Sequence, residues 1–422
     1  MAIFVRNLIC GLCLIILLNG CAFFKLKKEL AGLEDMYVLR GKIIDSSSHK
    51  KDILVVVYKK TPDDVLLNQA VIVNPQSGDY SLKVKKGTYF IGAFEDLNNN
   101  LAHDDGEPAG YYGKPDAIEI TGDPMDLQHP RTRTGLDFSI SASKRFPDGY
   151  HGEIRLTSEI VKQSVIKIGE LIRFDDKIMA QEFGSKGYWE PLTFLREVGI
   201  GIFFLEEYDE DKIPILFIHG AVGTPSGWKE TIEQINRDRY QPWFYYYPSG
   251  LPLDKMGAAL NTLVNELHRR YGFKKMYVVA QSMGGLVARS FIVKSVYESK
   301  QDFIKLFISV STPWNGHRMS EKGVKQAPVA VPSWYDMVPG SEFIEKLYER
   351  KLPSFLKHYL FFSYKGNCSL FLENNDGTVE LASELDYRAQ SEADRIFGYN
   401  EDHGSIIYSE RYLSQIQELL GM

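Results

Sequence analysis

The sequence predicts two folded parts, an N-terminal all-β sandwich and a C-terminal, mostly parallel sheet flanked by helices. Between residues 36 and 143, short strand-like segments such as "ILVVVYKK" and "YFIGAFED" alternate with turn residues, which is typical of a sandwich. From Asp209 onward, continuous apolar runs alternate with amphipathic helical patterns, as in a parallel sheet buried on both faces. The 422 residues are long enough for both parts.

Residues 1–20 have the pattern of an export signal. Arg6 precedes the apolar run Leu8–Leu18, which is shorter than the ~20 residues that span a bilayer. The run ends in "LNGC", which resembles the cleavage site of bacterial lipoproteins, whose cysteine is lipidated and becomes the first mature residue. This resemblance implies attachment to the bacterial cell envelope through Cys21, and Ala22 favours the outer membrane. The alternative is an ordinary signal peptide, or an uncleaved anchor, with a chance cysteine.

The composition limits the partners and the covalent chemistry. The formal net charge is −6 and no basic patch is present to neutralise phosphates, so we expect no nucleic-acid partner. Of the four cysteines, Cys10 and Cys13 lie in the predicted signal and Cys21 would carry lipid. Only Cys368 remains, so we expect no disulfide and a buried, inert thiol.

The short, charged segment 21–35 predicts a tether, and the sandwich over 36–143 follows it. "SGDYSLKVKKGTYFIGAF" resembles the small prealbumin-like and carboxypeptidase-regulatory-like sandwiches of exported proteins. Residues 144–205 form a connector that includes the first elements of the second domain, which occupies 206–422. In this connector, "EIVKQSVIKIGELI" predicts a helix and "VGIGIFFLEEYD" predicts a strand.

One stretch of the sandwich, "DLNNNLAHDDGE", has the oxygen ligands that Ca²⁺ prefers. They stand at positions one, three, five, nine and twelve of an EF-hand-like loop: Asp96, Asn98, Asn100, Asp104 and Glu107. Leu101 occupies the position that needs glycine, and the flanks predict strands rather than helices. The sequence therefore favours an Asx-rich turn, with a structural calcium ion as the weaker alternative.

In the second domain, the apolar runs predict buried strands, and "DKMGAALNTLVNELHRRYG" predicts a helix that stops at Gly272. The predicted strands are "IPILFIH", "PWFYYYP", "MYVVAQ", "LFISVS" and "LFFSY". In "MYVVAQSMGGLVARSF", one of these strands runs directly into a helix, with Ser282 at the turn. This resembles the nucleophile elbow G-x-S-x-G, with Ala280 in place of the first glycine. An ordinary N-cap serine is the alternative.

Three further features accompany the elbow. A buried strand ends in His219-Gly220, "NNDGTVEL" contains Asp376, and "YNEDHGSI" supplies His403, which gives the chain order Ser–Asp–His. Taken singly, Asp376 could be an Asp-Gly turn and His403 a surface histidine. Together they make the C-terminal half resemble α/β-hydrolases of the bacterial lipase and esterase type, with some similarity to GPI inositol-deacylase-like serine esterases.

This resemblance implies the α/β-hydrolase fold and a site. Ser282 would be the nucleophile, His403 the general base and Asp376 the acid that orients the imidazole. The resemblance also implies that the backbone N–H groups of Ala221 and Met283 form the oxyanion hole. His219 and Trp314 would lie beside the acyl pocket. The His219 imidazole itself is expected to hold its loop.

The substrate class follows from the segment after "STPWNGH", which is rich in proline and aromatic residues and predicts a cap over residues 314–355. A cap and a lipid anchor favour cleavage of a hydrophobic carboxylic ester, such as a lipid. The alternatives are an acyltransferase with the same triad and a non-catalytic binding lipoprotein. No H-E-x-x-H cluster or phosphate-binding glycine loop occurs, so we expect no catalytic metal or other cofactor.

Overall fold

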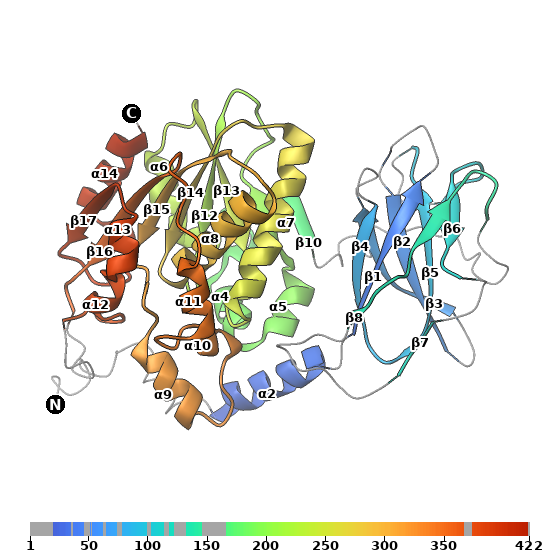
Figure 1. Cartoon of the computed structure of the whole chain (residues 1–422), viewed down its shortest axis with the longest axis horizontal. Helices are drawn as coiled ribbons and strands as arrows, with labels where there is room; N and C mark the ends of the chain where they lie inside the picture. The colour runs from blue at the N-terminus through green and yellow to red at the C-terminus, as the bar shows by residue number, and fades with distance from the viewer. Residues whose placement is uncertain are drawn as a thin grey trace. The chain divides into compact units, whose positions relative to one another are not determined.

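The computed structural model describes eleven stretches of the chain: 20–34, 37–45, 51, 53–61, 65–73, 78–98, 103–113, 118–121, 132–145, 166–366 and 374–420. Most of the predicted export signal, the Cys21 side chain, Asn100 and Cys368 lie outside the described residues. The chain divides into two compact units, with boundaries after Lys27 and after Val165. Figure 1 shows the elements of each unit.

The unit that begins at Lys28 contains two packed sheets. The first contains β1 (Tyr37–Asp45), β4 (Asp79–Val84), β8 (Thr132–Arg133) and β9 (Phe138–Ile140). The second contains β2 (Ile53–Lys60), β3 (Val65–Val73), β5 (Gly87–Glu95), β6 (Ala109–Tyr111) and β7 (Ile118–Ile120). Leu39 and Leu82 of the first sheet share a core with Val55 and Ile91 of the second. Burial of every second residue along β4 fits a strand with one face on that core.

The candidate calcium loop follows β5. Both carboxylate oxygens of Glu107 accept backbone hydrogen bonds, from the N–H of Leu97 at 2.7 Å and of Asp104 at 2.9 Å. The Asn98 amide donates to Asp104 at 2.7 Å. The two bonds to Glu107 tie the two ends of the loop together through its carboxylate. Calcium binding stays a prediction.

The other unit is built on an eight-stranded sheet. In chain order its strands are β10 (Ile166–Leu171), β11 (Ile200–Phe204), β12 (Ile213–Ile218), β13 (Tyr240–Tyr246), β14 (Met276–Gln281), β15 (Ile304–Val310), β16 (Lys357–Ser363) and β17 (Arg395–Tyr399). Their spatial order is β10-β11-β13-β12-β14-β15-β16-β17. All neighbours are parallel except β11 and β13. Because β14, β15, β16 and β17 are parallel neighbours in this order, their carboxyl ends lie at the same edge of the sheet.

The helix predicted for "EIVKQSVIKIGELI" is wrong over its described part, because Ile166–Leu171 forms β10. Its apolar residues also fit a period of two, and pairing with β11 gives the backbone its hydrogen-bond partners. Gly169 has a φ of 76° at a register shift next to this pairing, a conformation that a helix does not contain.

Helices and short turns of helix connect the strands. They are η1 (Lys177–Met179), α4 (Gln181–Trp189), α5 (Pro191–Glu197), η2 (Pro225–Trp228), α6 (Lys229–Gln234), α7 (Leu253–Tyr271), α8 (Met283–Val293), η3 (Lys294–Glu298), α9 (Arg318–Gln326), α10 (Pro332–Asp336), α11 (Glu342–Tyr348), α12 (Leu381–Glu384), α13 (Tyr387–Ser391), η4 (Ile406–Tyr408) and α14 (Glu410–Leu420). α7 ends as predicted at Gly272, whose φ is 64°. Among the described residues, none of the helices is long and apolar enough to cross a membrane.

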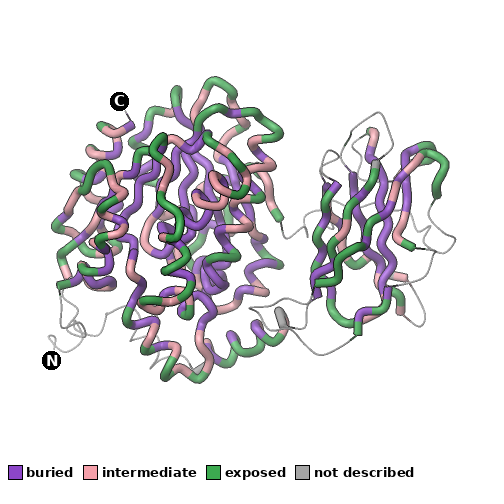
Figure 2. Tube along the Cα trace, in the orientation of Figure 1, coloured by how far each residue is buried: buried purple, intermediate pink, exposed green. Residues whose placement is uncertain are grey.

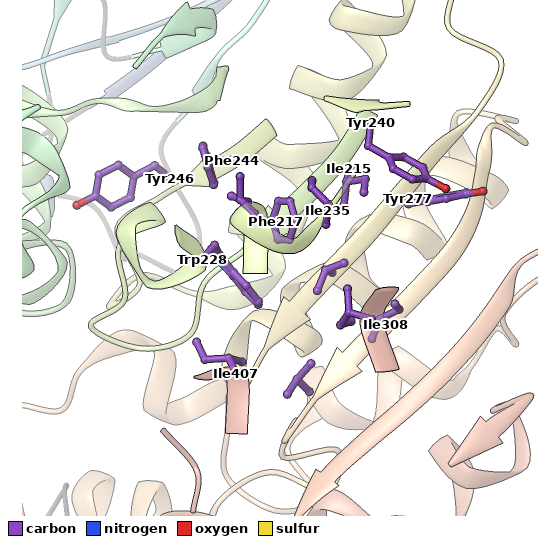
Figure 3. Packing of buried hydrophobic residues seen from close by; sticks show 14 of the residues in the cluster. Ile215, Phe217, Trp228, Ile235, Tyr240, Phe244, Tyr246, Tyr277, Ile308 and Ile407 are labelled. Carbon is purple, nitrogen blue, oxygen red and sulfur yellow. The ribbon is translucent and has the colours of Figure 1, made fainter. Parts of the chain in front are cut away.

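The central strands β12, β13, β14 and β15 are almost entirely buried, as the purple centre of Figure 2 shows. On one face, Phe217 and Ile308 share a core with Trp228 of η2, Ile232 of α6 and Ile416 of α14. Figure 3 shows part of this cluster around Phe217 and Trp228. Burial of such large apolar side chains fixes the sheet, and with it the loops at the carboxyl ends of its strands.

Residues 21–34 of the predicted tether belong to helix α2 (Gly20–Glu34). Phe23 and Leu26, three residues apart on one helix face, are buried, whereas Phe24 is 73% exposed. The Phe23 ring meets Trp189 of α4 edge to face at 5.5 Å, and Lys25 pairs with Glu190 at 3.1 Å. Packing of this apolar face explains why a charged segment is helical here.

Candidate active site

Ser282 stands between the last residue of β14 and the first of α8. Its φ of 55° and ψ of −134° are rare for a residue with a side chain. The Ser282 N–H donates to Val310 at 2.7 Å, and its carbonyl accepts from Gly285 at 2.9 Å. The Ser282 side chain makes no hydrogen bond to the helix N-terminus. Ser282 therefore occupies the N-cap position of α8 without capping the helix through its side chain, and its hydroxyl is left for another partner.

The neighbours of Ser282 explain the spacing of the motif. A Cβ on Gly284 would lie 2.5 Å from the His219 carbonyl oxygen, and a Cβ on Gly220 would lie 2.9 Å from the Ser282 Cβ. Ala280, which replaces the first glycine of the motif, is fully buried on β14. The turn therefore requires glycine two residues after Ser282, at Gly284, but accommodates the methyl group of Ala280 two residues before it.

Ser282, His403 and Asp376 come together although they are far apart in the sequence. His403 Nε2 lies 2.8 Å from Ser282 Oγ, and His403 Nδ1 lies 2.5 Å from Asp376 Oδ2. Because the carboxylate can only accept, the hydrogen-bond network assigns the proton to Nδ1. Nε2 then accepts from the Ser282 hydroxyl, as a general base must.

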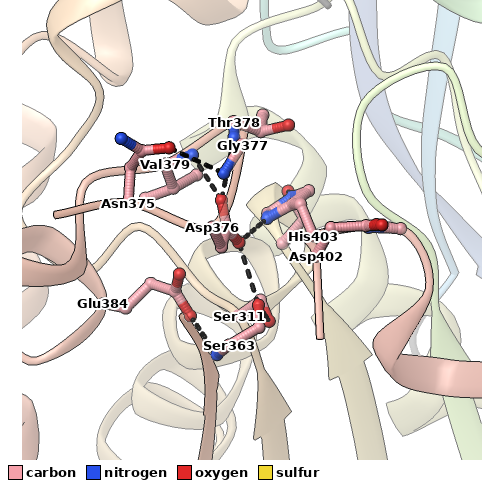
Figure 4. A network of polar contacts seen from close by, with 12 residues as sticks. Ser311, Ser363, Asn375, Asp376, Gly377, Thr378, Val379, Glu384, Asp402 and His403 are labelled. Atoms are coloured by element: carbon pink, nitrogen blue, oxygen red, sulfur yellow. Dashed lines mark hydrogen bonds and ion pairs between the residues drawn. The ribbon is translucent and has the colours of Figure 1, made fainter. Parts of the chain in front are cut away.

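The Asp376 carboxylate is held from several sides (Figure 4). Its Oδ1 accepts the N–H groups of Thr378 and Val379 at 2.9 and 2.7 Å. Its Oδ2 accepts the Ser363 hydroxyl at 3.0 Å besides His403. These four donors, in a site that is closed to solvent, fix the orientation of the Asp376 carboxylate and favour its charged form.

The charges of the site affect one another. Burial alone would raise the pKa of Asp376, but the charge and the hydrogen bond of His403 hold it well below its usual range. For His403, burial lowers the pKa, whereas the Asp376 charge and hydrogen bond raise it, and the net pKa is above 6.5. A charged carboxylate at this position is suited to stabilise an imidazolium at His403, if that side chain were to take a proton from Ser282.

The predicted oxyanion donors belong to two segments that meet at Ser282. Met283 is the first residue of α8, and Ala221 follows Gly220, the residue that touches Ser282. The loop is fixed at Val222, whose N–H donates to Ser249 at 3.2 Å and whose carbonyl accepts from Gln181 of α4 at 2.7 Å. Such fixed backbone N–H groups near a helix N-terminus favour a developing negative charge.

The structure agrees with the expected loop-holding role of the His219 imidazole, and it buries both His219 and Trp314 in the interior rather than on the wall of a pocket. His219 is buried, stacks on Tyr247 at 4.4 Å and has Nδ1 2.8 Å from the Gly220 carbonyl. Burial lowers the pKa of His219 to about 4, so the ring is neutral and serves to hold its loop. Trp314 is 1% exposed and packs on His358 and Phe307, which makes it a core residue.

The segment predicted as a cap contains α9, α10 and α11, and α10 is tied to its surroundings. The Ser333 N–H donates to Gly250 at 3.0 Å, and Asp336 accepts the N–H of Leu253 at 2.5 Å. Trp334 donates its indole N–H to Tyr188 of α4. These bonds fit a packed connection without a gating role better than a free lid.

Sequence reasoning did not find Glu384, which lies on α12 beside the triad. One ligand atom each from Asp376, Glu384 and His403 lie within 4.8 Å of one another, a spacing that could hold a metal ion. Both nitrogens of His403, however, are already bonded to Asp376 and Ser282. No sequence signal marks Glu384, because its contact depends on how the loop folds back on β16.

Comparison with known proteins concerns mainly this part of the chain. The model of a family described as alpha/beta hydrolase of unknown function (DUF915) matches residues 252–388. The match includes Ser282 and Asp376 but ends before His403. No curated protein matches the chain in sequence.

Several solved structures resemble part of the chain. A mature-form lipase of Bacillus licheniformis is 21% identical with a TM-score of 0.41, and the match covers 51% of this chain and 95% of that chain. A gene product of Listeria innocua is 16% identical with a TM-score of 0.39 and coverages of 50% and 94%. A phospholipase of Legionella pneumophila, PlaB, is 14% identical with a TM-score of 0.34 and coverages of 41% and 45%. Likenesses of this size say nothing about activity.

The strand order and the family match confirm the expected fold. Parallel strands carry the serine, the acid and the histidine on loops after β14, β16 and β17, in the order found in this fold. The C-terminal unit of this chain therefore has the α/β-hydrolase fold.

Proposed function

We propose that the protein is a serine hydrolase that cleaves a carboxylic ester through an acyl-enzyme. The observation that carries this proposal is the unbroken chain of hydrogen bonds from Ser282 Oγ through His403 to Asp376. A nucleophile, a general base and an orienting carboxylate at hydrogen-bond distance are the parts that acyl transfer requires.

In the proposed mechanism, Ser282 Oγ attacks the ester carbonyl carbon while His403 Nε2 takes its proton. The carbonyl oxygen becomes an oxyanion that the N–H groups of Ala221 and Met283 stabilise. His403 then gives its proton to the leaving alcohol, and the C–O bond breaks to leave an acyl-Ser282. Water, deprotonated by His403, releases the acid and restores the enzyme.

We propose a hydrophobic ester, such as a lipid, as the substrate, and attachment to the bacterial envelope, with the outer membrane favoured, through a lipidated Cys21. Helix α2 begins at Gly20 and is docked on α4 through Phe23. A lipid on Cys21 would therefore hold the hydrolase unit close to the membrane, where ester lipids are concentrated. The exposed Phe24 and Lys27 of this helix suit a lipid surface.

The test is hydrolysis of an ester panel of increasing acyl length, together with labelling by a fluorophosphonate probe. Wild type should hydrolyse at least one ester and label, and Ser282→Ala should do neither. Ser391→Ala, which removes an exposed serine hydroxyl away from the site, is the matched control and should behave as wild type. Equal labelling of wild type and Ser282→Ala would refute the nucleophile.

Product analysis with added alcohols separates hydrolysis from acyl transfer. Release of free acid at a rate independent of the alcohol supports a hydrolase. Transfer of the acyl group to the alcohol in preference to water would make the protein an acyltransferase. If no ester is turned over and no probe is bound, the site is not catalytic.

A further inference from the structure

The C-terminal unit contains a second buried carboxyl group beside the acid of the triad. Glu384, the last residue of α12, is 1% exposed. Its Oε2 accepts the N–H of Ser363 at 3.1 Å, whereas its Oε1 is buried and makes no hydrogen bond of normal geometry. Figure 4 shows Glu384 beside Ser363 and Asp376. A buried carboxylate oxygen without a donor is costly, so this atom requires an explanation.

A proton on Glu384 would explain why its Oε1 atom has no donor. One oxygen atom of Glu384 and one of Asp376 lie within 4.8 Å of each other, and two buried carboxyl groups this close favour a state in which one of them is protonated. Asp376 already accepts four donors and faces His403, which favours its charged form. Glu384 accepts one backbone donor, from Ser363, so the proton belongs on Glu384.

We propose that Glu384 is a neutral carboxylic acid that donates a hydrogen bond to the Asp376 carboxylate and so positions the acid of the triad. The proposal rests on the proposed function of that triad. Ser363 links the two acids, because its N–H binds Glu384 and its hydroxyl binds Asp376. Ser311 completes the network with its hydroxyl 2.7 Å from that of Ser363.

The electrostatics of the surroundings agree with this assignment. Burial and the adjacent Asp376 charge raise the pKa of Glu384 well above its ordinary value, and the Ser363 N–H and Ser311 hydroxyl oppose this only in part. Asp402 acts on His403 rather than on Glu384. Ser311, which follows β15, and Ser363, the last residue of β16, add hydroxyl groups but no charge to this network.

The remaining acids of the same loop have partners of their own. Glu380 lies 3.7 Å from His317 Nδ1, and Asp386 forms an ion pair with Arg388. Glu380 is buried like Glu384 but is paired with a different side chain. Glu380→Gln is therefore a matched control for the loss of a buried carboxyl group in this loop.

The test follows the rate of fluorophosphonate labelling of Ser282 as a function of pH. Its acidic midpoint reports the His403 pKa. If Glu384 is neutral, Glu384→Gln leaves this midpoint where it is, because no charge is removed. If Glu384 were ionised, removing a charge within 4.8 Å of the other two groups would lower the midpoint by about two pH units, which would overturn the proposal.

A second comparison tests the hydrogen bond itself. Glu384→Leu cannot donate, so it should label roughly tenfold more slowly than Glu384→Gln, whose amide can. Equal losses in both variants, with Glu380→Gln unaffected, would show that Glu384 only fills space. Labelling of wild type but not of Ser282→Ala keeps the nucleophile established whatever these variants do.

A third measurement does not depend on a folded variant or on activity. Infrared spectra of wild-type protein with ¹³C-labelled glutamate should show a protonated glutamic acid at neutral pH. Absence of this band would overturn the proposal even if the triad is active.

Discussion

The narrow space around Gly284 gives a sharp test of the nucleophile elbow. A Cβ at this position would lie 2.5 Å from the His219 carbonyl oxygen and 2.7 Å from that of Ile218. Ordinary contact begins at 3.4 Å, so Gly284→Ala requires a displacement of 3.4 − 2.5, about 0.9 Å. The His219 carbonyl cannot yield easily, because it accepts the Tyr247 hydroxyl at 2.8 Å.

This displacement affects stability and chemistry to different degrees. Overpacking costs about 1–3 kcal/mol, partly offset by about 1 kcal/mol from alanine's better helix propensity in α8. The larger effect is on geometry, because α8 and the loop that contains Ala221 would separate. A misplacement of this size costs about 100-fold in rate, and loss of one oxyanion donor costs about 100–1,000-fold.

The assay compares the second-order rate of fluorophosphonate labelling with the thermal unfolding midpoint. Gly284→Ala should label about 100-fold more slowly while its midpoint falls by only a few degrees. Gly227→Ala is the control, because its Cβ would meet only the Tyr408 hydroxyl at 3.8 Å. Labelling of Gly284→Ala within threefold of wild type would refute the proposed elbow geometry.

Three further outcomes follow from the structure. Because His403 must be neutral to accept a proton and its pKa is raised, kcat/KM for an ester should fall as pH decreases through a midpoint above 6.5, and a midpoint below 6.5 would contradict this. Burial lowers the pKa of His219 to about 4 and that of His358 to about 3, so the unfolded chain binds more protons than the folded chain below pH 6.5. The thermal unfolding midpoint should therefore drop as the pH falls from 6.5 towards 4. A midpoint that does not change over this range would contradict the prediction. Phe23→Ala removes the ring that packs on Trp189, so trypsin should cut after Lys27 faster than in wild type, whereas the exposed Phe24→Ala should cause no change.

The sequence located most of the catalytic unit because its signals are local. The apolar runs that form β12 to β16 are continuous, and the elbow puts small residues at fixed offsets from Ser282. Chain order was enough to select His403, which is the sole histidine after Asp376. Such patterns can be recognised in the sequence because the residues that form each of them lie within a short segment of the chain.

The sequence was less informative for segments whose structure depends on distant partners. Residues 166–171 become a strand because β11 lies beside them, and residues 20–34 become a helix with Phe23 on Trp189. The strand β17 was not predicted, since only pairing with β16 defines it. Propensity is a weak prior where a tertiary contact decides.

For this protein, the sequence by itself determined the two kinds of domain, the order of the strands along the chain and the candidates Ser282, Asp376 and His403. Only the tertiary structure decided that these three are bonded in line, that Trp314 belongs to the core, and that Glu384 lies against Asp376. The physical reason is that burial and contact across the sheet are properties of the folded chain. Burial and contact determine that the Ser282 hydroxyl faces His403, that the Asp376 carboxyl group is charged and that the Trp314 ring is shielded from water.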